Sequence, residues 1–218
     1  LQKVSLVDNK LKEVPSAFRN LKGLRKLHIS GNEALNYENL IDNLKDSNIE
    51  ELSIPLNSLS DIPKNIKDLK KLKVLDIRKN YIVELPSEIS DLDSLNEFIS
   101  EDNIFLDVNE ELSKLKGLNI KYLSFDPVKE DELMKIRSIF PKATIERKES
   151  EFPLLEDGTS SILDKGEPFD KSKLSGIKNC DKAIRQFYAL FFRRNDYFNY
   201  DSLGFFERLS NTKYSYND

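Results

Sequence analysis

The chain contains a single histidine, His28, which is the first residue to consider for acid–base chemistry. His28 occupies an outward position of a predicted strand, and Ser53 and Asp76 occupy the equivalent positions one and two strands further on. Neighbouring parallel strands lie about 4.8 Å apart, so His28 and Asp76 would be roughly 9 to 10 Å apart. This separation is too large for a direct hydrogen bond. The pattern therefore favours a histidine that faces solvent or a partner over a catalytic base.

The only cysteine, Cys180, is followed directly by Asp181. A lone cysteine excludes an intramolecular disulfide and a four-cysteine zinc site. Cys180 lies four residues before Ile184, at the start of an apolar helical stripe, so we interpret it as a small core residue rather than a nucleophile. The sequence also lacks a glycine-rich phosphate loop, clustered metal ligands and a GxSxG motif. It therefore predicts no catalytic residue, no metal and no cofactor.

The composition narrows the classes of partner. The chain has 218 residues, of which 39% are hydrophobic, as is usual for a folded globular protein. Charged residues make up 33% of the chain, but the formal net charge is only -4, which disfavours a broad basic surface for nucleic acid. No apolar run approaches the length of about 18 residues that a membrane span needs, and no signal-peptide pattern is present. We therefore expect neither a nucleic-acid partner nor a membrane span.

A repeated pattern organises the elements that must position any site, and residues 72–95 show it most clearly. Leu72, Leu75 and Ile77 follow the alternation LxxLxL, which predicts a short strand. Five units begin at Leu1, Leu24, Ile49, Leu72 and Leu95, and each has asparagine at its ninth position: Asn9, Asn32, Asn57, Asn80 and Asn103. We interpret these five residues as a structural asparagine ladder. Their side-chain amides would bond backbone groups of adjacent repeats where strand pairing ends.

Each repeat can bury only one face of its strand and one stripe of its return segment, so stacked neighbours must complete the core. In the return segments apolar residues such as Ile62 and Ile66 recur every three to four residues, which predicts a short helix or 3₁₀ turn. Three returns begin with a proline, and the two longer repeats lack it. The predicted fold is α/β, a curved solenoid with a parallel sheet on the concave side and short helices on the convex side.

The pattern changes after a sixth unit that begins at Ile120 and lacks the asparagine. Residues 129–140 predict an amphipathic helix and residues 143–147 a last strand, which together would cap the solenoid. Residues 149–170 are rich in Gly, Pro, Ser and acidic residues, which predicts an acidic linker. Phe and Tyr crowd the remainder, which predicts a helical aromatic extension. The predicted domains are a repeat domain at 1–148, a linker at 149–170 and the extension at 171–218.

Residues 1 to about 148 resemble the bacterial leucine-rich repeat proteins, whose repeats read LxxLxLxxNxLxxLPxxIxxLxx. The segment FPKATIE after the predicted closing helix is similar to the end cap of such proteins. This resemblance implies a surface that binds a protein but does not identify the partner. Secreted bacterial ubiquitin ligases join similar repeats to a domain with a cysteine nucleophile near an aspartate. The tail that carries Cys180 is much too short for that domain.

The outward strand positions would form one continuous concave face, and two interpretations of it are open. In the first, charges of opposite sign on neighbouring strands, such as Arg25 and Glu50, only satisfy one another. In the second, exposed apolar residues such as Val74 and Tyr122 mark the centre of an interface. The candidate protein-binding residues are Arg25, His28, Glu51, Val74, Asp76, Arg78, Ile99, Glu101 and Tyr122.

The sequence thus predicts a non-enzymatic module that binds a partner protein on its concave face, with host interaction as one role. Two alternatives remain open: an effector with an activity in the C-terminal extension, and a self-associating structural protein. We favour a monomer over self-association. Because Leu1 already occupies the first position of a repeat, we expect further residues upstream. The expected location is secreted or on the surface of a bacterium, with the cytoplasm as the alternative.

Overall fold

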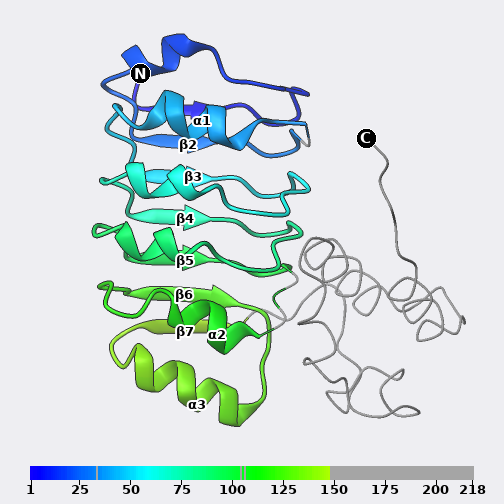
Figure 1. Ribbon diagram of the computed structural model, residues 1–218, viewed down its shortest axis with the longest axis vertical. Coiled ribbons are helices and arrows are strands. Elements are labelled where there is room, and N and C mark those ends of the chain that lie inside the picture. Colours follow the sequence, from blue (N-terminus) through cyan, green and yellow to red (C-terminus); the bar gives the residue numbers. More distant parts are fainter. Residues whose placement is uncertain (33, 104, 106, 148–218) are drawn as a thin grey trace, which may run out of the picture.

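The computed structural model describes residues 1–32, 34–103, 105 and 107–147. Within them, short parallel strands form one sheet in which each strand pairs with the next one in the chain (Figure 1). The strands are β1 (Lys3–Ser5), β2 (Lys26–His28), β3 (Glu51–Ser53), β4 (Val74–Asp76), β5 (Glu97–Ile99), β6 (Tyr122–Phe125) and β7 (Thr144–Arg147). Equivalent residues of successive repeats lie side by side in the sheet. The position of a residue in its repeat therefore determines its place on the sheet.

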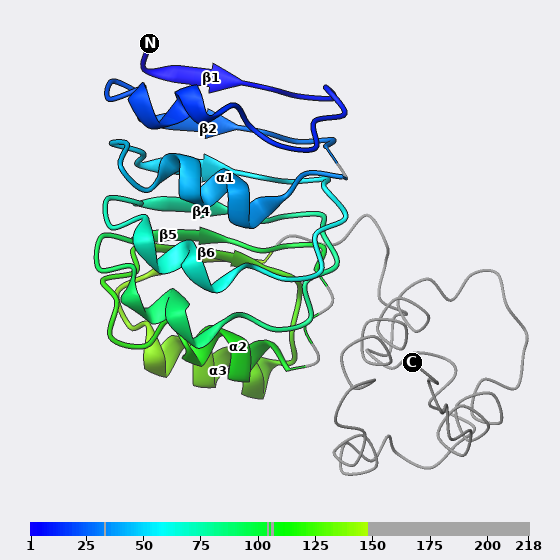
Figure 2. The same cartoon turned by 45° about the horizontal axis from the view of Figure 1, so that its top comes forward.

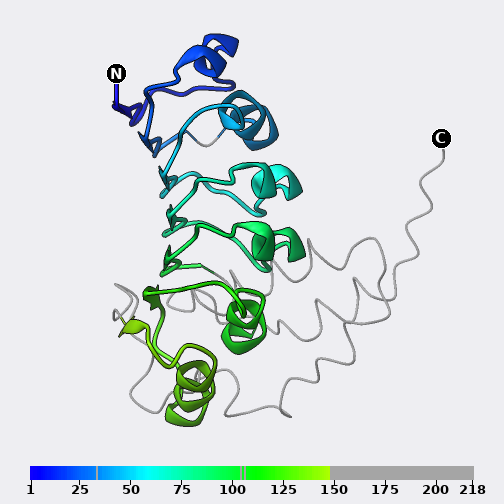
Figure 3. The same cartoon turned by 90° about the vertical axis from the view of Figure 1, so that its left-hand side faces the viewer.

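The return segments lie on the opposite side of the core from the sheet. They are η1 (Ser16–Asn20), α1 (Tyr37–Leu44), η2 (Lys64–Asp68), η3 (Ser87–Asp91), α2 (Val108–Ser113) and α3 (Glu130–Ile139), where η denotes a 3₁₀-helix. A view along the strands shows the sheet on the concave side and the helical segments on the convex side (Figure 3). A tilted view shows the helical segments stacked in chain order (Figure 2). These features confirm the predicted α/β solenoid.

The type of helix in a return segment follows from its first residues and its length. Pro15, Pro63 and Pro86 precede η1, η2 and η3, and their backbones are extended. The two longer repeats begin their returns with Asn36 and Asp107, whose side chains accept N-cap hydrogen bonds of 3.0 Å at α1 and α2. An α-helix rises about 1.5 Å per residue and a 3₁₀-helix about 2.0 Å, so an α-helix needs more residues to cover the same width.

The core lies between the sheet and the return segments and runs along the whole stack. In the fourth repeat Leu72, Leu75 and Ile77 of the strand side are fully buried. They belong to one continuous cluster that also contains Ile89 and Leu92 of the return. Burial of each such side chain contributes about 1.5 to 3 kcal/mol, which is why a repeat depends on its neighbours for stability.

The last two elements close the described part of the stack. The helix predicted at 129–140 is α3, and the strand predicted at 143–147 is β7, which pairs in parallel with β6. Leu133 and Ile136 of α3 are fully buried. The predicted linker at 149–170, the extension at 171–218 and Cys180 lie outside the described residues. None of the helices in the described part of the chain has the length and apolarity needed to cross a lipid bilayer.

Candidate functional site

Four asparagines at the ninth repeat position are buried and join each repeat to the one before it. The Asn80 side-chain oxygen accepts hydrogen bonds from the backbone N–H of Asn57 (3.0 Å) and of Leu59 (3.1 Å). Its amide donates to the carbonyl of Ile54 (2.9 Å). Asn32, Asn57 and Asn103 donate in the same way to the sixth residue of the preceding repeat. The side chains thus satisfy buried backbone groups at the point where strand pairing stops.

Asn9 differs from the other four, contrary to the expectation that all five are equivalent. It is exposed, and its amide donates only to the carbonyl of Val7 in its own repeat (2.8 Å). Within the described residues β1 pairs with β2 alone, and Asn9 forms no bond to another repeat like those of Asn80. In the part of the chain that the structure describes, Asn9 therefore does not link two repeats as Asn80 does.

The residue before each asparagine also repeats its backbone conformation. Five residues have φ between +53° and +65°: Asp8, Gly31, Leu56, Lys79 and Asp102. Each of the first five repeats thus has one strand, one left-handed turn residue and one asparagine at the ninth position, and the repeats stack in a parallel sheet with helical returns. These features define a single type of repeat. The chain folds as a leucine-rich repeat solenoid. This assignment comes from the chain's own repeats and their geometry.

Comparison with known proteins found no matching family model and no matching curated protein. Solved structures with a similar fold include a leucine-rich repeat protein of Leptospira interrogans (25% identity, TM-score 0.49, 66% of this chain and 36% of that one). They also include an internalin of Listeria monocytogenes (24% identity, TM-score 0.48, 64% of this chain and 39% of that one). A third is human 5T4, the trophoblast glycoprotein (21% identity, TM-score 0.44, 58% of this chain and 59% of that one). The chain thus spans less than two thirds of each of these structures.

The outward side chains of the solenoid's strands form two rows across the concave face. The first row contains Lys3, Lys26, Glu51, Val74, Glu97, Tyr122 and Thr144. The second row contains Ser5, His28, Ser53, Asp76, Ile99, Ser124 and Glu146. Of the other candidates, Arg25 lies directly before β2, and Arg78 and Glu101 lie two residues after the ends of β4 and β5. The register places six of the nine candidates on one face. Arg25 lines the same groove as Lys26 and Glu51. Arg78 and Glu101 contact Asp76 and Ser124 of that face.

The charges over β2 to β4 neutralise one another at the edge where the strands begin. Glu50 accepts hydrogen bonds from Arg25 (3.1 Å) and Lys73 (2.8 Å), and the bond from Lys73 lowers the pKa of the Glu50 carboxyl. Glu51 pairs with Lys26, and this hydrogen bond raises the pKa of the lysine. These contacts correspond to the first of the two interpretations, a set of charges that satisfy each other.

His28 lies in the same row as Ser53 and Asp76, but their order does not suit nucleophilic catalysis. The Ser53 hydroxyl, which lies between the other two residues, donates to the Asp76 carboxylate at 3.0 Å. In a catalytic triad the histidine stands between the serine and the acid and accepts the hydroxyl proton. This arrangement instead makes Ser53 a hydrogen-bond donor to a buried carboxylate.

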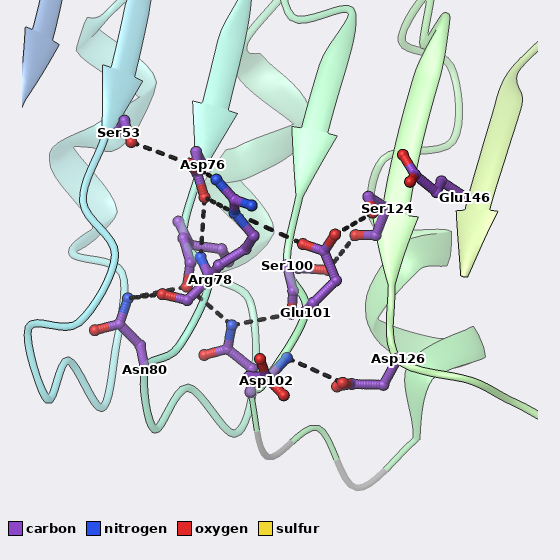
Figure 4. Close-up of polar contacts among 12 residues, drawn as sticks. Ser53, Asp76, Arg78, Asn80, Ser100, Glu101, Asp102, Ser124, Asp126 and Glu146 are labelled. Carbon is purple, nitrogen blue, oxygen red and sulfur yellow. Dashed lines mark hydrogen bonds and ion pairs between the residues drawn. The ribbon is translucent and has the colours of Figure 1, made fainter. Parts of the chain in front are cut away.

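Arg78 holds a network of buried carboxylates at the ends of β4 to β6 (Figure 4). Its Nε and Nη2 atoms donate to both oxygens of Asp76, at 2.9 and 2.8 Å, and Nε lies 3.9 Å from Glu101. Asp76 and Glu101 are only 5% and 3% exposed. The hydrogen bonds to Asp76 raise the pKa of Arg78. The Ser124 hydroxyl donates to Glu101, so the network crosses three strands.

The half-buried side chains of Val74, Ile99 and Tyr122 lie next to this network. In the register Glu97 stands between Val74 and Tyr122 in the first row, and Ile99 follows Glu97 on the same strand. The Tyr122 hydroxyl donates a hydrogen bond to Glu146. Burial of the phenol is the main cause that raises its pKa, and the hydrogen bond to Glu146 raises it further. These three apolar side chains correspond to the second interpretation, the centre of an interface.

Two residues important to this surface were absent from the candidate set. Glu97 is not among the nine candidates, although its position between Val74 and Tyr122 follows from the repeat template. Glu146 was missed because the surface was not extended into the capping strand. The alternation of Thr144 and Glu146 with Ile145 was the available signal. No group of three or more His, Cys, Asp or Glu side chains within the described ranges could hold a metal ion.

Proposed function

We propose that this solenoid is a non-enzymatic module that binds a partner protein on its concave face, centred on Val74, Ile99 and Tyr122. The proposal rests on one observation: these half-exposed apolar side chains lie on the outward face of the sheet, where they are not part of the core. Apolar and aromatic groups surrounded by charged residues are the usual composition of an interface centre. Arg25 and Glu51, which pair with their neighbours, would contribute to the rim.

Affinity measurements on matched variants test this proposal once a partner has been captured. Truncation of Tyr122 to alanine should weaken binding by more than about 1 kcal/mol, because a buried aromatic anchor is lost. The control is Lys64→Ala on the convex side, where the lysine is 81% exposed. Loss of binding on convex substitution, with unchanged affinity after Tyr122→Ala, would show that the proposed face is wrong. Thermal melting of both variants checks that the fold is retained.

The biological setting is also a proposal. The resemblance to bacterial leucine-rich repeat proteins supports a bacterial module that is secreted or displayed and that contacts a host protein. Light scattering over a concentration series distinguishes this monomeric binder from a self-associating structural protein. A mass that rises with concentration, and that Tyr122→Ala returns to the monomer value, would favour self-association through the same face.

A further inference from the structure

Glu97 lies at the centre of the apolar part of the concave face. The strand register places Val74 on one side of it and Tyr122 on the other, and Ile99 faces the same side two residues later. Neighbouring strands are about 4.8 Å apart and alternate residues about 6.6 Å apart, so each apolar residue is directly adjacent to Glu97. We call these four residues, Val74, Glu97, Ile99 and Tyr122, the Glu97 patch. It presents one carboxylate with apolar surface on three sides.

The Glu97 carboxylate retains its capacity to bind a cation. In the part of the chain that the structure describes, its side chain forms no hydrogen bond and no ion pair. The nearer of the two lysines in the same row, Lys26, is paired with Glu51 and attracts Glu97 only at longer range. Glu97 is half-buried, so a partner would meet it at the surface rather than in the core. An ionised carboxylate can accept up to about four hydrogen bonds, which suits a donor with several N–H groups.

The charge around the patch attracts a cation. On this face, strands β4 to β7 and the positions one or two residues after β4 to β6 carry five carboxylates and one guanidinium: Asp76, Glu97, Glu101, Asp126, Glu146 and Arg78. By contrast, the groove of about 320 Å³ over β1 to β4 is lined by four basic residues, Lys3, Arg25, Lys26 and Lys73, and by two acidic ones, Glu50 and Glu51. The concave face therefore runs from positive at β1 to negative at β7, which directs a cationic group to the Glu97 patch.

We propose that the Glu97 patch is a subsite for an arginine side chain of the partner protein. The guanidinium would pair with Glu97 and pack on the ring of Tyr122, and the arginine methylenes would lie along Val74 and Ile99. A planar guanidinium can donate two parallel hydrogen bonds to a carboxylate and stack on an aromatic ring, whereas a lysine ammonium cannot do both in this way. This inference rests on the proposed function and names the group that the concave face would recognise.

The test is an NMR titration of the isotope-labelled full chain with two peptides, Gly-Phe-Arg-Ser-Gly and the same peptide with neutral citrulline in place of arginine. We expect the methyl resonances of Val74 and Ile99 to shift and saturate. The citrulline peptide should bind about two- to fivefold more weakly, the usual range for a partly exposed ion pair. In Glu97→Gln this difference should disappear. It should persist in the control Glu13→Gln, which neutralises an exposed carboxylate in the first repeat.

The possible outcomes distinguish failure of the arginine subsite from failure of the proposed concave binding face. Equal affinities of the two peptides, or a difference that survives in Glu97→Gln, would overturn the arginine subsite while shifts at Val74 and Ile99 still supported a concave binding face. Saturable shifts confined to convex residues such as Met134 would count against both. If neither peptide produced a saturable shift at its solubility limit, the subsite would also be wrong. Unchanged melting of Glu97→Gln confirms that the variant retains its fold.

Discussion

Replacing Arg78 with methionine should destabilise the solenoid, because one guanidinium holds two buried carboxylates on the concave face. Asp76 and Glu101 are each at least 95% buried. Arg78 forms two hydrogen bonds of 2.8 and 2.9 Å to Asp76 and lies 3.9 Å from Glu101. After the substitution Asp76 would keep the hydroxyl of Ser53 and the backbone N–H of residue 78 (3.2 Å) as donors, but no opposite charge in this network.

The size of the effect follows from the burial of the two partners. Removing one member of a fully buried ion pair costs about 3 to 5 kcal/mol. The Arg78 side chain is 38% exposed, so water screens part of the interaction and replaces part of it afterwards. We therefore expect a loss of about 2 to 3 kcal/mol in the free energy of unfolding. For a domain of this size, that loss corresponds to a decrease of about 4 to 12 °C in Tm.

Urea unfolding and thermal melting of three variants test the reasoning. Arg25→Met removes a guanidinium from an exposed pair, with Glu50 at 3.1 Å, and should change Tm much less. Arg78→Met combined with Asp76→Asn should be more stable than Arg78→Met alone, since a neutral amide tolerates burial without a cation better. If Arg78→Met melts within about 1 °C of the unmodified chain, the guanidinium does not hold this face together. Arg78 is then as suitable a probe of partner binding as Tyr122.

Three further predictions concern the fold. Asn80→Ala should lower the free energy of unfolding by about 1 to 3 kcal/mol, because it leaves buried backbone groups without partners. Asn9→Ala, the control, should change it by less than about 0.5 kcal/mol. Similar urea midpoints for the two variants would contradict this prediction. Burial raises the Glu111 pKa above 4.5, so the folded state binds more protons and this group's contribution to stability falls as pH rises through the raised pKa. Glu111→Gln should therefore gain stability relative to the unmodified chain from about pH 4.5 to pH 7 in urea unfolding, and a pH-independent difference would refute the sign. Gly31→Ala should lower the free energy of unfolding by about 1 to 2 kcal/mol and so lower Tm, because φ is +65° at this position and the added carbon would displace the Asp8 side chain. An unchanged Tm would show that the turn tolerates a side chain.

The repeat spacing was sufficient to predict the sheet because the same positions are buried in every strand. Leu72, Leu75 and Ile77 are core residues, as the alternation required. The type of each return helix was not predicted, because it depends on the caps Asn36 and Asp107 and on two additional residues rather than on the apolar spacing. The left-handed turn before each asparagine was also missed. Among those five residues Gly31 has the type that adopts this conformation most readily, and Asp8 and Asp102 have a type that adopts it occasionally. Leu56 and Lys79 give no such signal from sequence.

The outward positions of the concave face were predicted by alternation, but the contacts among them were not. Asp76 was expected at the surface, and it is buried because Arg78 folds back over it from two residues further on. Alternation determines the face on which a side chain lies and carries no information about its rotamer. Likewise the bond from Tyr122 to Glu146 depends on β7 pairing with β6, a contact between a repeat and its cap. Such contacts need coordinates rather than a repeat template.

Under the proposed function, the polar network and the Glu97 patch together would make β4 to β7 better suited to recognition than β1 to β3. Asp76 holds Arg78 through two hydrogen bonds, and Glu146 holds the hydroxyl of Tyr122, so both large side chains are already ordered before a partner arrives. A partner that meets an ordered surface loses less side-chain entropy on binding, typically by about 0.5 to 1.5 kcal/mol for each side chain already fixed. Glu97, which makes no such contact among the described residues, is left as the acidic group available for a new ion pair. In this proposal the network would supply rigidity, and the patch would supply the group that the partner recognises.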